Sequence, residues 1–289
     1  MSDYGIDRAI EGLGHRWGCG IDNFRLIHRH VDKAAYYATY PDGKRVIVKV
    51  DLRRERYCNE LLMLELAHAH GLPVPEVVFT DDGDFGLTVL THLPGAALVL
   101  QDSIGCVNTG SLLRQLHSLP PNRHLRPFSG SDGSWAGLLQ RYRDEVKRFV
   151  GLGLFDANLM QRLQALVERG LEANQVPTMT IIHGDLQRFH VLLEPNSHQV
   201  TGLLDLADAG LGDPLWDIAV LTSRGDVCTT NLLQGYGADD ALRARADSVL
   251  PAYRVVRWMG EVRWRRVHGV EIGRQLRHLG MAATTSTAF

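Results

Sequence analysis

The stretch that decides the fold is IIHGDLQRFHVLL, residues 181–193, in which two apolar segments flank a short polar loop. The loop contains one acid, Asp185, and a histidine five residues later, His190. Twenty residues after Asp185, the apolar segment VTGLLD ends in Asp205. If these apolar segments pair as a hairpin, both carboxylates lie at one edge of it. Two acids held close together need a cation, so the pattern indicates a metal site.

A second pair of charged residues lies earlier in the chain. Lys49 interrupts the apolar run VIVKV, and Glu60 lies on the helical segment that follows. Because a buried lysine is costly unless it is paired, we expect Glu60 to reach back to Lys49. Each signal is weak alone, since turn aspartates and strand lysines are common. Together, a lysine, two acids and a proton acceptor are the parts that phosphoryl transfer requires.

The first third of the sequence predicts a small antiparallel sheet with one helix. Residues 53–70 have apolar positions at helical spacing, and Gly71 ends that segment. Turn sequences such as Pro41-Asp42-Gly43 separate short segments that are rich in β-branched or aromatic residues. These strand-like segments are residues 23–29, 35–40, 45–51, 76–80 and 86–91.

The rest of the sequence predicts a mainly helical lobe, except for β segments around the polar loop. Leu93-Pro94-Gly95 breaks the pattern and is expected to be a hinge. We therefore predict an α+β, two-lobed fold, with a β-rich lobe at residues 1–92 and a helical lobe at residues 93–289. The expected helices are residues 109–118, 135–150, 158–174, 214–222 and 241 to about 279.

Composition and charge exclude several classes of protein. The 289 residues are 45% hydrophobic and 22% charged, which is ordinary for a globular protein. A formal net charge of −2 gives no general attraction to nucleic acid or to an anionic membrane, so neither partner is expected. Residues 1–18 do not have the pattern of a signal peptide, and no uncharged apolar stretch is long enough to span a bilayer. Four scattered cysteines predict no zinc site, no disulfide framework and a reducing cytoplasm.

These motifs together resemble the aminoglycoside phosphotransferase family, which shares the two-lobed fold of protein kinases. IIHGDLQRFHVLL followed by GLLDLADAGLGDPLWDIAVL is similar to that family's catalytic loop, metal loop and following helix. The segments VIVKV, NELLMLELAHAHGLPVPEVV, LTHLPG and LRQLHSL also match. The resemblance covers residues 23–225, while an expected N-terminal helix and the last part of the chain match only in helical character.

The resemblance implies a role for each of the charged residues. In the catalytic loop, 183–190, Asp185 corresponds to the aspartate that orients the acceptor hydroxyl. In the metal loop, 205–208, Asp205 corresponds to the aspartate that binds Mg²⁺. Lys49 corresponds to the lysine on the α- and β-phosphates of ATP, or of GTP, and Glu60 to its partner on the helix. In the nucleotide-binding lobe, backbone groups would hold the purine at Leu90, Thr91, His92 and Leu93.

Two features depart from the family's pattern. The loop HRHVDKAAY, residues 28–36, has no glycine where backbone amides commonly approach phosphate. Either Lys33 and the small residues after it contact the phosphates in place of glycine amides, or the phosphates are held less closely. Kinases place asparagine five residues after the catalytic aspartate, whereas this chain has His190. Histidine also occurs there in aminoglycoside 2″- and macrolide 2′-phosphotransferases, so we expect His190 to bind the metal or orient Asp185. The alternative is a hydrogen bond to the loop backbone only.

The resemblance implies Mg²⁺-dependent transfer of the γ-phosphate of a nucleoside triphosphate to a hydroxyl of a small molecule. An antibiotic is the first acceptor class, namely an aminoglycoside, a macrolide or a related natural product, with resistance or self-protection as the consequence. A monomer or homodimer is expected. The alternatives are a housekeeping kinase for a small metabolite and a nucleotide-binding pseudokinase. Magnesium-dependent phosphorylation that is lost in Asp185→Ala distinguishes the enzymes from the pseudokinase.

The charges of the last helical segment bear on which acceptor the protein uses. A polycationic aminoglycoside needs an acidic pocket, yet residues 241–279 carry nine arginines against three acids. A solvated helix face is the simpler interpretation. If this face lines the cleft instead, a neutral or anionic substrate is favoured, and Trp258 and Trp264 become candidates for ring stacking, although core packing is their default. Asp213 and Asp217 of GDPLWD are expected to be structural, since Asp213 lies where a helix N-cap belongs.

Overall fold

The computed structural model describes residues 22–39, 42–83, 85–122, 124–125, 127–128, 132–174, 179–224 and 228–285. The expected N-terminal helix lies outside these residues. The chain divides into two compact units. Unit 1 contains the residues up to Ala97 together with His190–Asp208, and unit 2 contains Leu98–Phe189 and Ala209–Phe289.

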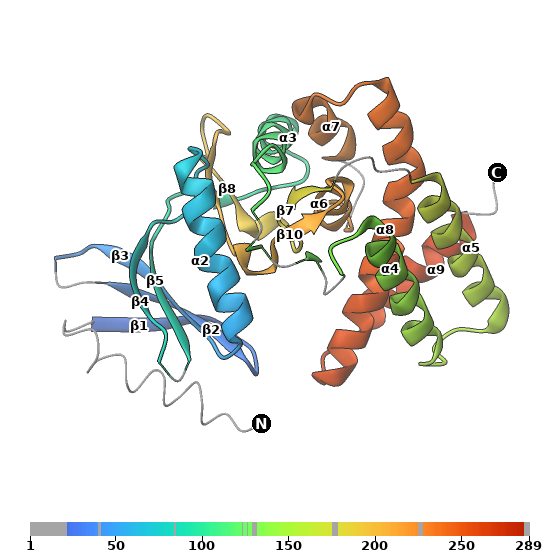
Figure 1. Cartoon of the computed structure of the whole chain (residues 1–289), viewed down its shortest axis with the longest axis horizontal. Helices are drawn as coiled ribbons and strands as arrows, with labels where there is room; N and C mark the ends of the chain where they lie inside the picture. Colours follow the sequence, from blue (N-terminus) through green and yellow to red (C-terminus); the bar gives the residue numbers. More distant parts are fainter. Residues whose placement is uncertain are drawn as a thin grey trace. The chain divides into compact units, whose positions relative to one another are not determined.

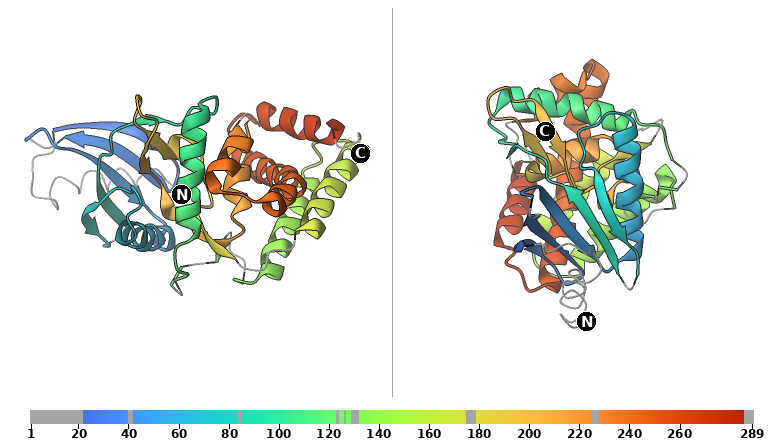
Figure 2. Two further views of the ribbon diagram at one scale, coloured as in Figure 1. Left: turned by 90° about the horizontal axis from the view of Figure 1, so that it is seen from above. Right: turned by 90° about the vertical axis from the view of Figure 1, so that its left-hand side faces the viewer.

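Unit 1 is built on a five-stranded antiparallel sheet (Figure 1; Figure 2). Neighbouring strands follow each other along the chain as hairpins, except that β5 lies between β3 and β4. The strands, in their order across the sheet, are β1 (Asp22–Arg29), β2 (Lys33–Thr39), β3 (Arg45–Asp51), β5 (Gly86–Thr91) and β4 (Val77–Asp81). The predicted antiparallel sheet is therefore present.

Alternation along the strands decides which face each side chain takes. In β3, Val46, Val48 and Val50 are buried in one apolar cluster with the alternate residues of β2 and β5. Successive side chains of a strand point to opposite faces. Lys49 therefore lies on the other face of the sheet, where it is paired in register with Ala35 of β2.

The helix of unit 1, α2 (Arg54–Ala69), runs beside this sheet (Figure 1). It contacts the short 3-10 turn η3 (Leu206–Asp208), which follows the strand β9 (Val200–Leu203). β9 pairs with β8 (Val191–Leu193), and β8 pairs in turn with β6 (Ala96–Ala97). These pairings join residues 190–208 to unit 1, whereas the sequence-based boundary at residue 92 assigned them to the second lobe.

Unit 2 is mainly helical. Four of its described helices begin with an aspartate or serine whose side chain accepts a hydrogen bond from the backbone amide three residues on, which is the favoured N-cap arrangement. α8 contacts α4, α5, α6 and α9 (Figure 1; Figure 2). The helices are α3 (Ser103–His117), α4 (Trp135–Val150), α5 (Ala157–Ala173), α6 (Leu215–Leu221), α7 (Thr229–Tyr236), α8 (Asp240–Val267) and α9 (Gly273–Thr285).

Three expectations about unit 2 and the β segments need correction. The helix predicted from residue 241 to about 279 is two helices, because Gly269 takes a left-handed backbone conformation (φ 67°) and ends α8. The helix α7 was not expected. The strand before the polar loop, β7 (Thr180–Ile182), pairs with β10 (Gly210–Gly212) and not with the strand that follows the loop.

A disulfide joins Cys106 of α3 to Cys228, which precedes α7, with their Cα atoms 5.9 Å apart. The prediction that the scattered cysteines form no disulfide framework is therefore wrong, because the chain returns Cys228 to the side of α3 at a sequence separation of 122 residues. Cys58 is a free, exposed thiol. None of the helices in the described part of the chain is both long and apolar enough to cross a membrane.

Candidate active site

Unit 1 brings together a lysine and two carboxylates. The Lys49 ammonium donates to Oδ1 of Asp205 at 2.8 Å and also to Glu60 of α2. The contact between Lys49 and Glu60 that the sequence predicts is therefore present. Lys33, from the start of β2, approaches the other oxygen of Asp205 at 3.5 Å. The glycine-free segment, residues 28–36, thus supplies a second cation, Lys33, to the same carboxylate.

The pKa values of this cluster follow from burial and from the opposite charges. Burial alone would lower the pKa of Lys49, but the carboxylates of Asp205 and Glu60 raise it overall. Burial would raise the pKa of Asp205, yet Lys49, Lys33 and His190 hold it well below its usual range. Lys49 and Asp205 are therefore both charged at neutral pH, as an ion pair that is largely shielded from water.

The backbone places His190 beside Asp205. The amide of Leu204 donates to the carbonyl of His190 at 2.8 Å, which fixes the two segments side by side. His190 Nε2 then lies 3.7 Å from Asp205 Oδ2. Asp205 itself has φ of 61°, a left-handed conformation that is uncommon outside glycine and is tolerated best by Asp and Asn. The turn after β9 thus aims the carboxylate at Lys49 and His190.

Asp205 and His190 suit Mg²⁺ only as part of a nucleotide complex. Within the described ranges, no group of three or more His, Cys, Asp or Glu side chains is arranged to hold a metal ion alone. Mg²⁺ is usually bound by one or two carboxylates together with substrate phosphates and water. One carboxylate with an adjacent imidazole fits that pattern, although oxygen is the ligand that Mg²⁺ prefers.

Two side chains of α2 hold the turn after Asp205, and neither was predicted from the sequence. Arg56 pairs with Asp208 of η3 and, at 3.2 Å, with Asp51 of β3. The amide nitrogen of Asn59 donates to the carbonyl of Ala207 at 3.1 Å. A signal was available, because Arg56, Asn59 and Glu60 are polar residues at i, i+3 and i+4, which share one face of a helix.

The region at residues 90–93, predicted to hold the purine, lies at the end of β5. The amide of His92 donates to the Arg45 carbonyl at 3.3 Å. The imidazole of His92 packs edge-on against Tyr37, with ring centroids 5.5 Å apart. Arg25 stacks on the Tyr37 ring, and these four side chains line a pocket of unit 1. The structure thus places aromatic and cationic groups at this end of the sheet.

In unit 2 the HGD loop is anchored by Asp217. Asp217 is fully buried and accepts hydrogen bonds from the backbone amides of His183 (2.7 Å) and Gly184 (2.9 Å). His117 Nε2 lies 3.1 Å from the same carboxylate, and the Trp216 indole donates to the Gly184 carbonyl at 2.9 Å. Gly184 has φ of 85°, which lets the chain turn sharply before Asp185. These contacts are structural, as the sequence predicts for Asp217.

Asp213 is buried in the same way and lies just before α6, but the N-cap position of that helix is Pro214 and not Asp213 as the sequence predicted. Its carboxylate accepts from the amide of Leu215 at 3.0 Å and from the Tyr253 hydroxyl at 2.8 Å. Asn174 donates to it at 2.9 Å, and Arg245 of α8 pairs with it. These partners satisfy the buried charge of Asp213 from several sides. The role of Asp213 is therefore structural, like that of Asp217.

Asp185 is half-buried and has an arginine partner. Arg257 of α8 donates from Nη2 to Asp185 Oδ1 at 2.6 Å, and Gln187 lies 3.4 Å from both carboxylate oxygens. For Arg257 the solvated-face interpretation is therefore wrong. This residue was not predicted, because arginines at many positions of one helix give no sign of which one points inward.

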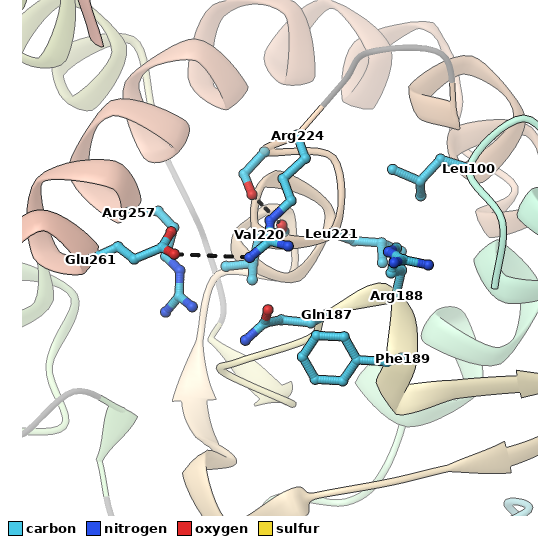
Figure 3. Close-up of a pocket in the computed structure, with 10 residues that line it drawn as sticks. Leu100, Gln187, Arg188, Phe189, Val220, Leu221, Arg224, Arg257 and Glu261 are labelled. Atoms are coloured by element: carbon cyan, nitrogen blue, oxygen red, sulfur yellow. Dashed lines mark hydrogen bonds and ion pairs between the residues drawn. The ribbon is translucent and has the colours of Figure 1, made fainter. Parts of the chain in front are cut away.

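A pocket of unit 2 opens beside this ion pair (Figure 3). The loop contributes Gln187, Arg188 and Phe189 to its lining, and α8 contributes Arg257 and Glu261. The remaining wall comes from Leu100, which precedes α3, and from the end of α6 and the residues after it, including Leu221 and Arg224. The pocket therefore combines apolar surface with several guanidinium groups.

Residues 23–258 match the family model described as "Phosphotransferase enzyme family". The chain belongs to the phosphotransferase enzyme family. The matched region includes Lys49, Glu60, Asp185, His190 and Asp205. The family and the enzyme class predicted from the sequence are both confirmed.

Relatives within the phosphotransferase enzyme family act on different compounds. An aminoglycoside 3′-phosphotransferase of Streptomyces fradiae is 28% identical over 197 residues, which cover 61% of this chain and 70% of the relative. A homoserine kinase of Pseudomonas aeruginosa is 28% identical over 248 residues, 80% of this chain and 71% of the relative.

Solved structures of other phosphotransferases share the fold. An aminoglycoside 2′-phosphotransferase-IIIa in complex with GDP has a TM-score of 0.76 at 15% identity, covering 97% of this chain and 98% of that chain. A macrolide 2′-phosphotransferase of Brachybacterium faecium has a TM-score of 0.69 at 19% identity, with coverage of 95% and 97%. The predicted kinase-like α+β fold is thereby confirmed.

Proposed function

We propose that this phosphotransferase transfers the γ-phosphate of a nucleoside triphosphate to a hydroxyl group of a small molecule, with Mg²⁺. The observation that carries the proposal is the Lys49 ammonium shared between Glu60 and Asp205, with His190 beside the same aspartate. A lysine for the phosphates and an acid for the metal are the two electrostatic parts that kinase chemistry needs.

Each residue of unit 1 takes one part in this proposal. Lys49 binds the α- and β-phosphates, and Glu60 holds its ammonium in place. Asp205 and His190 would hold Mg²⁺, which supplies positive charge at the β- and γ-phosphates when bound. Backbone groups at residues 90–93 would hold the purine of ATP, or of GTP. Complexes of relatives with GDP support a nucleotide site in the family.

In unit 2, Asp185 orients the acceptor hydroxyl. The bond from the acceptor oxygen to the γ-phosphorus forms as the bond to the bridging β,γ-oxygen breaks, and the hydroxyl proton leaves toward Asp185. We propose direct transfer without a phosphorylated enzyme. Initial rates measured at several concentrations of both substrates should give intersecting reciprocal plots, whereas parallel plots would indicate a phosphoenzyme.

Two acceptor classes have support. The aminoglycoside and macrolide phosphotransferases among the relatives favour an antibiotic acceptor, with resistance or self-protection as the result. The homoserine kinases favour a small metabolite, and the arginine next to Asp185 suits such a compound better than a polycation. Expression in a susceptible bacterium, tested across antibiotic classes, separates the two, because a metabolite kinase leaves susceptibility unchanged.

The expected cytoplasmic location and the expected monomer or homodimer are also proposals. Access to nucleoside triphosphates supports the cytoplasm. The bond between Cys106 and Cys228 opposes it, because disulfides are commoner in oxidising compartments. Labelling of free thiols in protein from freshly lysed cells, with and without prior reduction, shows in which state these two cysteines occur.

The proposal is tested by nucleotide binding and turnover in the presence and absence of Mg²⁺. Asp205→Ala should abolish magnesium-dependent turnover and remove the effect of Mg²⁺ on nucleotide affinity. Asp247→Asn is the matched control, since Asp247 is an exposed acid of α8. If Asp205→Ala binds nucleotide and turns over with the same magnesium dependence as the control, the assignment of Asp205 fails. If the parent binds nucleotide but phosphorylates no acceptor, a pseudokinase is the better description.

A further inference from the structure

The pocket beside Asp185 holds more positive than negative charge. Among the described residues that line it, the charged ones are Arg188, Arg224, Arg257 and Glu261 (Figure 3). Asp185 adds a carboxylate through its ion pair with Arg257. Three guanidinium groups therefore meet two carboxylates.

The Glu261 carboxylate is shared by other donors. Its Oε1 accepts from Arg265 at 3.1 Å and from Gln275 at 2.8 Å, while Arg224 lies at 3.9 Å. The distance to Arg224 is beyond that of a hydrogen bond, so Glu261 neutralises this arginine only in part. Figure 3 marks the contact between Arg224 and Glu261 and shows Arg257 next to Glu261, and both arginines line the pocket.

The surroundings of the pocket are also cationic. Burial and the neighbouring Arg274 lower the pKa of the Arg224 guanidinium, against the effect of Glu261. Burial together with Arg274 and Arg277 lowers the pKa of His278, which stacks on Trp258 of α8. Both shifts have the same physical cause, burial combined with an accumulation of arginines whose charges repel another cation.

A pocket of this kind binds an anion. The planar fork of a guanidinium matches the two oxygens of a carboxylate or the oxygens of a phosphate, and a polycation would be repelled. Phe189 is 44% exposed and, with Leu221, gives the pocket an apolar wall for a short carbon skeleton.

We propose that the acceptor is a small hydroxylated molecule that carries an anionic group, a carboxylate or a phosphate, and that Arg224 and Arg257 bind this group. The proposal rests on the proposed function and names the class of its acceptor. Arg257 then exchanges the carboxylate of Asp185 for the anionic group of the acceptor. This exchange releases Oδ1 of Asp185 from its ion pair with Arg257. Oδ1 then accepts a hydrogen bond from the hydroxyl of the bound acceptor molecule.

Pairs of acceptors with and without an anionic group test this proposal. L-homoserine is compared with its amide, glycerol 3-phosphate is compared with glycerol, and kanamycin serves as the polycation. The full chain, Arg224→Gln and Arg266→Gln are assayed with ATP or GTP and Mg²⁺, and the phosphorylated acceptor is quantified by mass spectrometry. Arg266 is the control, because it is an exposed arginine of the same helix as Arg257 and does not line the pocket.

The charged member of at least one pair should exceed its neutral partner at least about tenfold in kcat/KM, since a charge-assisted hydrogen bond has about that effect. The pair that responds tells whether carboxylate or phosphate is bound. Arg224→Gln should remove most of this preference through a higher KM, and Arg266→Gln should keep it.

Three results overturn the proposal. They are a preference for kanamycin or a neutral acceptor, a charge preference that Arg224→Gln leaves intact, and the absence of phosphorylation of both anionic acceptors while nucleotide still binds. Failure of the proposed function looks different, because Mg²⁺ and the Asp205→Ala substitution then have no effect on nucleotide binding or turnover.

Discussion

Asp205 faces three nitrogen groups at once: Lys49 at 2.8 Å, Lys33 at 3.5 Å and His190 at 3.7 Å. At the scale of single residues, this is how a partly buried carboxylate that is largely shielded from water remains ionised, since an unpaired buried carboxylate would take up a proton. The same logic applies one turn later, where Arg56 pairs with Asp208. These pairs hold the turn after β9, which carries the aspartate of the proposed metal site.

The first prediction concerns acid stability. Burial opposes ionisation of Asp208, but Arg56 lowers its pKa below the usual value near 3.9. A carboxyl with a lowered pKa stabilises the folded state above about pH 4, and this contribution is lost as the pH falls toward the folded pKa. Asp208→Asn should therefore lower the free energy of unfolding by about 1–3 kcal/mol at pH 7.

This deficit should shrink as the pH falls below about 4, when the parent also loses its carboxylate. Urea unfolding of both proteins between pH 7 and pH 3 measures it. A deficit that stays constant over the whole range would show that the substitution disturbs packing and not the ion pair with Arg56.

The second prediction concerns His190. Imidazole is a softer ligand than an amide oxygen, so the ratio of turnover with Mn²⁺ to turnover with Mg²⁺ should be higher in the parent than in His190→Asn. His190→Asn should keep substantial turnover, whereas His190→Ala should lose much of it. If His190→Ala matches the parent in turnover and metal dependence, the histidine only holds the loop.

Part of this residue-scale chemistry was predictable. Lys49 and Asp205 are visible in the sequence because each interrupts or ends an apolar run. The polar helix face that Arg56 shares with Asn59 and Glu60 is also visible, but its partner Asp208 is 152 residues away and is not. Arg257 is not visible at all, because arginine is common on solvated helix faces and its partner, Asp185, is 72 residues away. Contacts over such separations depend on tertiary structure that a local pattern does not contain.

At the scale of elements, the packing of α3 against α7 depends on two glycines. A Cβ at Gly235 of α7 would overlap the Val107 carbonyl of α3, and one at Gly110 of α3 would overlap the Leu232 carbonyl of α7. The two backbones are therefore in direct contact. The helix α7 was not predicted because a short helix with a glycine near its end resembles a loop, and only packing against α3 stabilises it.

The third prediction is that Gly235→Ala destabilises the protein by about 1–3 kcal/mol, because the helices must move apart. Gly280→Ala is the control. It lies in α9 with no atom within 4 Å of the added methyl group, so the better helix propensity of alanine should leave stability unchanged or raise it by about 0.5–1 kcal/mol. Thermal unfolding of both variants gives the comparison, and equal shifts would contradict the packing explanation.

At the scale of the whole molecule, the candidate groups are divided between the two units. Lys49, Glu60, His190 and Asp205 belong to unit 1, and Asp185 belongs to unit 2. The strands of unit 1 were predictable because their alternation is regular. That residues 190–208 belong to unit 1 was not predictable. Their place there rests on the pairing of β8 with β6, and β6 lies far earlier in the chain.

The fourth prediction follows from this division. Lys49→Met should weaken nucleotide binding together with turnover. Asp185→Asn should leave nucleotide affinity close to that of the parent and lower turnover at least about a hundredfold, since Asp185 acts on the acceptor. Calorimetric titration with nucleotide and a turnover assay separate the two effects. A large loss of nucleotide affinity in Asp185→Asn would contradict this assignment.

The bond between Cys106 and Cys228 encloses residues 107–227 in a covalent loop, and this loop contains Asp185, His190 and Asp205. A single proteolytic cut anywhere inside it leaves both fragments joined. The nicked chain should migrate as one species on a denaturing gel and separate into two fragments only after a reducing agent is added. A cut before residue 106 or after residue 228 releases its fragment without reduction.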